Sequence, residues 1–259
     1  MVGKTIDRIR AFWNEQAETH CTGLAATTPD PLLKKLEIDA LRRALDPDLD
    51  TLEVGCGNGY NILELLKTFR GQLVGVDYAS AMVGAAKKAL ASFDAGDRVE
   101  FYVADVLEDL EFLGKFPQIF TDRCLINLPS LDLQIQALKN LENLLLPGGR
   151  LALIECTQQS QERLNDLRGK VGLEPIPYHW HNLYLDEDEF LIRIPETLKH
   201  VGTDQFSSLY YVISRVFNAK LTPKGQEPDY LAEINQIAWE LPSFGDYGPH
   251  KLFLFEKTS

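Results

Sequence analysis

The feature that most constrains the fold is an alternation of short apolar runs with amphipathic helical patterns between residues 51 and 156. Hydrophobic residues recur at helical spacing over residues 62–69, 80–90 and 133–145, between runs of strand length. Strands that alternate with helices form right-handed βαβ units, which build a parallel sheet. The sequence therefore predicts an α/β fold with a doubly wound, mostly parallel, seven-stranded Rossmann-like sheet. We expect its first five strands at Thr51–Val54, Leu73–Val76, Val99–Val103, Gln118–Thr121 and Arg150–Glu155.

Beyond Cys156 the alternation becomes irregular. Two further segments, Gln205–Tyr211 and Lys251–Glu256, are predicted to be the sixth and seventh strands. Residues 1–45, 157–185 and 212–242 show helical patterns or stretches rich in proline and aromatic residues. We expect them to form helical cap elements around one sheet, so that residues 1–259 make a single domain.

Composition excludes several classes of protein. The chain has 259 residues, 45% of them hydrophobic and 25% charged, which is typical of soluble globular domains. Its formal net charge of −12 repels phosphate backbones and argues against nucleic-acid binding. The chain has no apolar stretch of membrane-spanning length and no signal-peptide core, so we expect a cytoplasmic protein without membrane contact. Its four scattered cysteines lack metal-ligand spacing, which predicts reduced thiols and no metal site.

A glycine-rich loop follows the first predicted strand, with glycines at positions 55, 57 and 59. Glycine lets the backbone turn tightly and approach a ligand closely, although a plain strand-to-helix turn also explains such a loop. Asp77 and Asp105 end the next two strands, where carboxylates accept hydrogen bonds from ribose hydroxyls and from an adenine amino group. A strand-end acid or a helix cap is the structural alternative for each. Glu53 would repel a pyrophosphate, so a nucleoside that carries an amino acid fits better.

Four segments in this order resemble the successive motifs of class I S-adenosylmethionine-dependent methyltransferases. They are Leu52–Gly59, Val76–Tyr78, Ala104–Val106 and Leu146–Leu151, and the resemblance covers roughly residues 48–156. It implies S-adenosyl-L-methionine as the cofactor and S-adenosyl-L-homocysteine as the product. It also implies an N-terminal helical cap at 1–45, a cofactor-binding core at 46–156, and acceptor-side cap segments with the C-terminal strands at 157–259.

The resemblance assigns a set of residues to the parts of the cofactor. The methionine part would lie against Glu53, Gly55, Cys56, Gly57 and Gly59. The nucleoside would contact Asp77 at the ribose, and Tyr78, Met82, Asp105 and Val106 at the adenine, with Arg123 beneath the cofactor.

The acceptor is expected to be a small molecule that is methylated on oxygen or nitrogen, such as a sugar, a lipid precursor or a secondary metabolite. A hydroxyl nucleophile profits from a general base, which is most often histidine. His179 and His181 are the candidates, because they lie in the cap segment after the fifth strand and would face the same way if extended. A structural histidine explains either residue equally well. Candidate acceptor-binding residues are Trp13, His20, Tyr184, Tyr210 and Tyr211, with core packing as the alternative for the aromatic ones.

Two other functions compete with methyl transfer. A nicotinamide-dependent oxidoreductase could share the sheet, but the GxGxG spacing and Glu53 argue against it. A noncatalytic cofactor-binding protein that acts through partners would keep the same loop. The expected assembly is a monomer or a homodimer.

Overall fold

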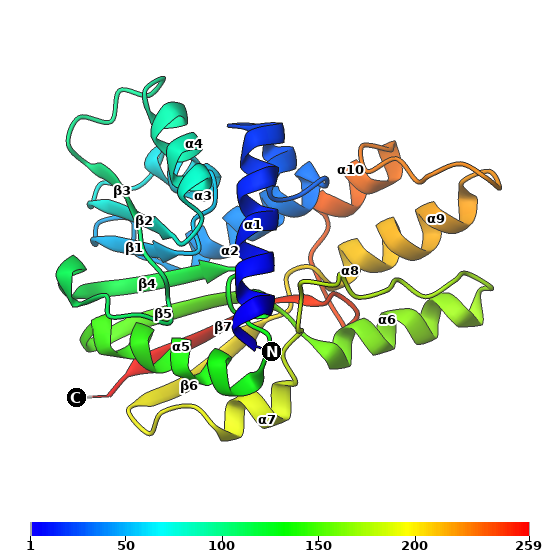
Figure 1. Cartoon of the computed structure of the whole chain (residues 1–259). Helices are drawn as coiled ribbons and strands as arrows, with labels where there is room; N and C mark the ends of the chain where they lie inside the picture. Colours follow the sequence, from blue (N-terminus) through cyan, green and yellow to red (C-terminus); the bar gives the residue numbers. More distant parts are fainter. Residues whose placement is uncertain (1, 259) are drawn as a thin grey trace.

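The computed structural model describes residues 2–258, with side chains from residue 5 onward (Figure 1). Seven strands form one sheet in the order β3-β2-β1-β4-β5-β7-β6. Neighbouring strands among β1–β5 pair in parallel, whereas β7 is antiparallel to both β5 and β6. The predicted fold class is confirmed. The strands are β1 Thr51–Val54, β2 Leu73–Asp77, β3 Val99–Val103, β4 Phe116–Asp122, β5 Leu145–Cys156, β6 Leu198–Asp204 and β7 His250–Lys257.

Helices cover both faces of the sheet. Along β5, Leu151 and Leu153 pack with α5, while Ala152 and Ile154 pack with α2 and α3 on the other face. A strand that is buried on both faces has no polar side, which is why β5 is continuously apolar over these residues. The helices of the core are α2 Pro31–Ala44, α3 Tyr60–Leu66, α4 Ser80–Leu90 and α5 Leu131–Leu144, with α7 Glu187–Ile192 beside α5.

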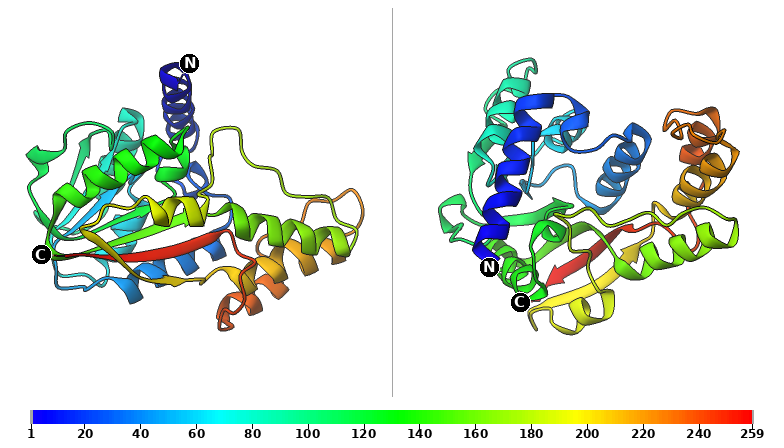
Figure 2. Two further views of the ribbon diagram at one scale, coloured as in Figure 1. Left: turned by 90° about the horizontal axis from the view of Figure 1, so that it is seen from below. Right: turned by 45° about the vertical axis from the view of Figure 1, so that its right-hand side comes forward.

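The remaining helices form the cap. They are α1 Val2–His20, α6 Gln158–Lys170, α8 Ser208–Tyr211, a π-helical segment Val212–Phe217, α9 Asn218–Leu221 and α10 Glu233–Glu240. In Figure 1, α1 crosses in front of the sheet and α6, α9 and α10 gather on one side of it. The two views of Figure 2 keep α6, α9 and α10 together. None of the helices in the described residues is long and apolar enough to cross a membrane.

The predicted position of the sixth strand is wrong. The structure places β6 at Leu198–Asp204, and the segment that follows turns into α8. Strand β6 lies at the edge of the sheet and pairs with β7 alone among the described strands, so most of its side chains are only partly buried and no apolar run marks it. The aromatic residues Tyr210 and Tyr211 suggested a strand, but they are buried among cap helices instead.

Candidate active site

The glycine loop between β1 and α3 has a backbone that only glycine tolerates. Gly55 and Gly57 have φ angles of +78° and +53°, a region that other residues rarely adopt. A Cβ on Gly55 would lie 2.7 Å from the Cβ and Sγ atoms of Cys124. The loop therefore leaves its own backbone as the surface that a ligand meets.

Asp77, at the end of β2, lies against this loop. Its two carboxylate oxygens accept hydrogen bonds from the backbone N–H groups of Gly57 and Ala79, each at 2.8 Å. Burial raises the pKa of Asp77 to about 6, although the two hydrogen bonds oppose that shift. The carboxylate is therefore ionised at neutral pH and is held in a fixed orientation.

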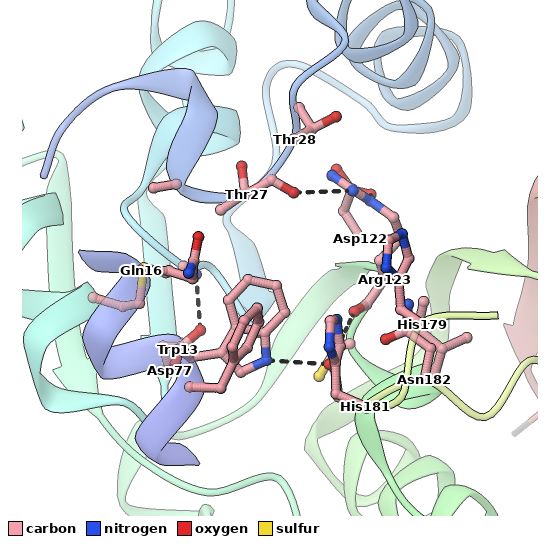
Figure 3. Close-up of a pocket in the computed structure, with 18 of the residues that line it drawn as sticks. Trp13, Gln16, Thr27, Thr28, Asp77, Asp122, Arg123, His179, His181 and Asn182 are labelled. Carbon is pink, nitrogen blue, oxygen red and sulfur yellow. Dashed lines mark hydrogen bonds and ion pairs between the residues drawn. The ribbon is translucent and has the colours of Figure 1, made fainter. Parts of the chain in front are cut away.

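A cavity of about 340 Å³ opens at the carboxyl ends of β1, β2 and β4 (Figure 3). Its lining combines the glycine loop with residues of α1, the segment 25–29 and the loop 179–182. This is the sheet edge at which α/β folds bind ligands. Its lining side chains include Phe12, Trp13, Gln16, Thr27, Thr28, Asp77, Tyr78, Met82, Asp122, Arg123, Cys124, Asn127, His179, His181 and Asn182.

A smaller cavity adjoins it and shares Gly55, Tyr78, Cys124 and Asn127 with it. Asp105 and Val106 line this second cavity. The Asp105 carboxylate is paired with Arg10 of α1 at 2.8 Å, and the Arg10 guanidinium lies 5.0 Å from the centre of the Tyr78 ring. Helix α1 thus covers this end of the site.

A third, polar recess lies on the other side of the glycine loop. Lys34, which is almost fully buried, places its Nζ 2.5 Å from both Glu37 and Asp122. Asn61 donates to Asp122 at 3.0 Å. Lys34 and Glu37 were not predicted from the sequence to be part of the site. The signal that could have revealed them is an oppositely charged pair, three residues apart, inside an otherwise apolar helix face.

Arg123 follows β4 and connects this recess to the large cavity. Its φ of +58° is unusual for a residue with a side chain. The guanidinium donates to the backbone oxygen of Thr27 at 3.2 Å and contacts Asp122 and Glu37. Burial lowers the pKa of Arg123, but the two acids more than offset this, so its pKa is raised. Arg123 is a permanent cation that ties the segment 25–29 to the core.

Glu155, at the end of β5, fixes the loop that carries Arg123. Its carboxylate accepts hydrogen bonds from the backbone N–H groups of Cys124, Leu125 and Ile126 at 2.9–3.2 Å. It also accepts one from the hydroxyl of Thr121 at 2.9 Å. With four donors and no exposed surface, Glu155 holds the shape of the loop and does not face the ligand.

The loop 179–182 faces α1 across the cavity through a cluster of rings. His181 stacks on Phe12 with ring centres 4.5 Å apart, and His179 stacks on His181 at 5.6 Å. Trp13 meets His181 edge-on and donates from its indole N–H to Asn127 at 3.1 Å. Burial and the neighbouring His179 lower the pKa of His181 to about 4, so this ring is neutral at physiological pH.

Comparison with known proteins gives the family. Residues 51–149 match the family described as a methyltransferase domain. A polyketide synthase-nonribosomal peptide synthetase of Aspergillus clavatus is 31% identical over 129 residues, which are 48% of this chain and 3% of that protein. The chain therefore spans a small fraction of the length of this curated relative.

Two solved structures share the fold. The N-methyltransferase NodS from Bradyrhizobium japonicum WM9, in complex with S-adenosyl-L-homocysteine, has 15% identity and a TM-score of 0.59, covering 95% of this chain and 99% of that one. Geranyl diphosphate C-methyltransferase from Streptomyces coelicolor A3(2) has 14% identity and a TM-score of 0.59, covering 87% and 80%.

Residues 51–149 of this chain form a methyltransferase domain, and the surrounding sheet has the Rossmann-like fold of class I S-adenosylmethionine-dependent methyltransferases. The domain match covers the glycine loop and the strand-end acids, which are the same segments that carry the sequence motifs. The matched domain is of the kind that transfers methyl groups from S-adenosyl-L-methionine.

The methyltransferase brings most of the predicted cofactor residues together. Gly55, Gly57, Asp77, Tyr78, Met82 and Arg123 line the large cavity, Asp105 and Val106 the smaller one, and Cys56 the polar recess. Glu53 lies behind the loop, fully buried, where Asn61 donates to it at 2.7 Å and burial raises its pKa to about 8. Gly59 is also behind the loop, where a Cβ would approach Phe101 at 2.8 Å.

Only some of the predicted catalytic and acceptor-binding residues line the large cavity. Trp13 lines the cavity, as do His179 and His181. His20, Tyr184, Tyr210 and Tyr211 are not in its described lining. Tyr184 packs edge-on against Tyr178, and His20 is exposed at the end of α1.

The two cap tyrosines have a structural role. Tyr210 donates its hydroxyl to Asp30 at 2.8 Å, and Asp30 also pairs with Arg215 at 2.6 Å. Asp30 caps α2 by accepting from the backbone N–H of Leu33 at 3.0 Å. Tyr211 is buried beside this cluster. Their aromatic character reflects packing of the cap on α2, a role that the sequence does not distinguish from acceptor binding.

Proposed function

We propose that this methyltransferase moves the methyl group of S-adenosyl-L-methionine to an oxygen or nitrogen atom of a small-molecule acceptor inside the 340 Å³ cavity. The observation that carries the proposal is that the glycine loop and the pair His179 and His181 line one and the same cavity. A cofactor on the loop would then have a neutral imidazole beside its acceptor. The acceptor classes are a secondary metabolite, a sugar or a lipid precursor.

The comparisons support a secondary metabolite among these classes. The Aspergillus clavatus relative is named as a polyketide synthase-nonribosomal peptide synthetase. NodS is named as an N-methyltransferase, and the Streptomyces coelicolor enzyme as a C-methyltransferase. Because the same fold serves acceptors of different kinds, the acceptor atom follows from the cavity and not from the fold.

The cofactor would lie across the three cavities. Asp77 would accept hydrogen bonds from the ribose hydroxyls, because its oxygens are ionised and held in place by backbone N–H groups. The adenine would lie between Tyr78 and Val106, and the methionine part would extend toward Asp122 and the glycine loop. In this orientation of the cofactor, the sulfonium methyl group would lie in the large cavity.

Methyl transfer requires few chemically active groups from the protein. The acceptor oxygen or nitrogen forms a bond to the methyl carbon while the carbon–sulfur bond breaks, which leaves S-adenosyl-L-homocysteine. Alignment of the nucleophile and exclusion of water account for much of the barrier reduction. The neutral His181 would receive the proton that the acceptor loses and pass it to solvent.

The proposal also covers the partners, the cellular location and the assembly of the protein. The acidic surface argues against nucleic-acid partners, and the cysteines are all free, in accord with a cytoplasmic enzyme. We infer a monomer or a homodimer that acts on a freely diffusing acceptor.

Calorimetric titration with S-adenosyl-L-methionine, S-adenosyl-L-homocysteine and NADH tests the cofactor. We expect the two sulfur nucleosides to bind and NADH not to bind, with binding lost in Asp77→Ala. Binding of NADH alone would overturn the proposal. Transfer of labelled methyl groups to a metabolite panel then separates the enzyme from a noncatalytic cofactor-binding protein, since the latter binds the nucleosides without turnover.

A further inference from the structure

The large cavity has two chemically different halves. Its charged lining residues, Asp77, Asp122 and Arg123, stand at strand ends next to the glycine loop. The other half is formed by α1, the segment 25–29 and the loop 179–182. It contributes no Asp, Glu, Lys or Arg side chain to the described lining. Its groups are rings, amides and hydroxyls, chiefly Phe12, Trp13, Gln16, Thr27, Thr28, His179, His181 and Asn182.

The charges of the first half are already paired within the protein. Both oxygens of Asp77 accept backbone N–H groups. Asp122 takes Lys34 and Asn61 on one oxygen and Arg123 on the other. Two acids, Asp122 and Glu37, neutralise Arg123 and Lys34. A charged acceptor would therefore displace an existing partner to obtain its own.

The cations at the edge of the site are also engaged. Arg10 pairs with Asp105 at 2.8 Å, and the Arg8 guanidinium lies 4.1 Å from the centre of the Trp180 ring. The net charge of −12 adds a field that disfavours the approach of an anion. An acceptor with a carboxylate or phosphate thus meets neither a free cation in the described lining nor an attractive surface.

The uncharged half is organised around flat rings. Phe12, Trp13, His179 and His181 contact one another at ring-centre distances of 4.5–5.6 Å, and the indole N–H of Trp13 is already satisfied by Asn127. Such a wall binds another ring by stacking or edge contacts.

We propose that the acceptor is a flat, uncharged molecule: an aromatic ring whose hydroxyl or amino group is methylated while the ring packs on Trp13, since the His181 ring is already stacked between Phe12 and His179. This proposal rests on the proposed function, and it narrows the acceptor from any small molecule to one class. The hydroxyl or neutral amino group faces the cofactor, and the rest of the ring lies along the wall. Sugars, whose hydroxyls ask for many polar partners, and phosphorylated precursors are disfavoured.

A matched set of three probes tests the proposal: 2-naphthol, 3-hydroxy-2-naphthoic acid and the saturated decahydro-2-naphthol. Each is titrated near neutral pH into the protein saturated with S-adenosyl-L-homocysteine, with calorimetry and tryptophan fluorescence as readouts. We expect 2-naphthol to bind at least about tenfold more tightly than either of the others, as one lost stacking contact or one unpaired charge implies. It should also quench tryptophan fluorescence.

Variants locate the binding. Trp13→Phe should keep the affinity for 2-naphthol within about threefold, since one ring replaces another, but should remove the part of the quenching that does not come from Trp180, which lies edge-on to His181 at 5.3 Å. Trp13→Ala should weaken 2-naphthol about tenfold and leave S-adenosyl-L-homocysteine unchanged. Trp239→Phe is the control, because Trp239 packs with the cap helices, and there the quenching should persist.

Each contrary outcome has a distinct meaning. Equal or tighter binding of the naphthoate would show that Arg123 receives an anion, and equal binding of the saturated probe would show that ring shape is not recognised. Either result overturns the proposal, and so does the absence of 2-naphthol binding when S-adenosyl-L-homocysteine binds. Failure of S-adenosyl-L-homocysteine itself to bind would refute the proposed function instead.

Discussion

The two walls of the cavity differ in how they are built. The cofactor wall, which is the part of the lining proposed to bind the cofactor, consists of a loop and strand ends from one continuous stretch of the core, residues 53–124, where backbone N–H groups of Gly57 and Ala79 hold Asp77. The acceptor wall joins α1, the segment 25–29 and the loop 179–182, and its contacts run between side chains. Backbone geometry leaves few alternatives, whereas a wall of side chains can change its specificity by substitution.

The largest effect is expected where the backbone leaves no room. Gly55→Ala adds a Cβ 2.7 Å from Cys124 and strains a φ of +78°. The loop must shift, and we expect cofactor affinity to fall by at least about 100-fold, because the backbone contacts move together. Calorimetry with S-adenosyl-L-homocysteine measures the loss. Gly84→Ala is the matched control, since a Cβ there meets nothing within 4 Å; equal behaviour of the two variants would refute the argument.

Substitution of His181 should affect methyl transfer without affecting cofactor binding, which distinguishes the roles of the two walls. His181→Gln should slow methyl transfer by about 10²–10⁴-fold if the ring accepts the proton. Affinity for S-adenosyl-L-homocysteine should stay within about twofold, because the ring belongs to the acceptor wall. Single-turnover kinetics at saturating cofactor give the rate. His179→Gln is the companion variant; a larger loss there would transfer the base to His179, and unchanged turnover in both would remove the pair from the mechanism.

Removal of the Asp77 charge tests the cofactor wall without steric change. Asp77→Asn keeps the size of the side chain but removes its charge, and its NH2 group replaces one of the two oxygens that accept backbone N–H groups. We expect about 10- to 100-fold weaker cofactor binding from one or two lost charge-assisted hydrogen bonds. The kcat at saturating cofactor should change much less than the KM. A fall in kcat with unchanged KM would contradict the assignment of Asp77 to binding.

Asp77 should make cofactor affinity depend on pH below neutrality. Asp77, with a pKa of about 6, binds ribose hydroxyls best when ionised. Its contribution should therefore be nearly complete at pH 7 and fall by up to about tenfold per pH unit below pH 6, as protons compete with the cofactor. His181, with a pKa of about 4, stays neutral over this range. In Asp77→Asn the slope should vanish, and a slope that persists would point to another group.

The smallest effect is expected behind the acceptor wall. Tyr210→Phe removes the hydroxyl that donates to Asp30 and should lower the free energy of unfolding by about 1–2 kcal/mol. Methyl transfer should be unaffected, since Tyr210 lies outside the described lining. Thermal unfolding and turnover, compared with Tyr247→Phe at a half-exposed site, measure the difference. Lost turnover with normal stability would return Tyr210 to the acceptor site.

The cofactor wall was easier to predict from the sequence than the acceptor wall. Gly55, Asp77 and Asp105 were recognised because a glycine loop and strand-end acids recur within one short stretch with a regular spacing. The sequence did not show that Tyr210 and Tyr184 lie outside the described cavity lining, because an aromatic residue that packs against a helix and one that faces a ligand have the same local pattern. The edge strand β6 was missed because few of its residues are buried.

The sequence by itself determined the order of strands and helices between residues 51 and 156, the glycine loop and the resemblance to a methyltransferase domain, because these depend on local periodicity and on backbone preferences of neighbouring residues. Only the tertiary structure decided that Lys34 and Glu37 lie buried with Asp122, that Arg123 joins the loop 25–29 to the core, and that His181 stacks on Phe12. Charge pairing and ring contacts join residues far apart in the chain, and their energies depend on burial, which exists only once the chain is folded.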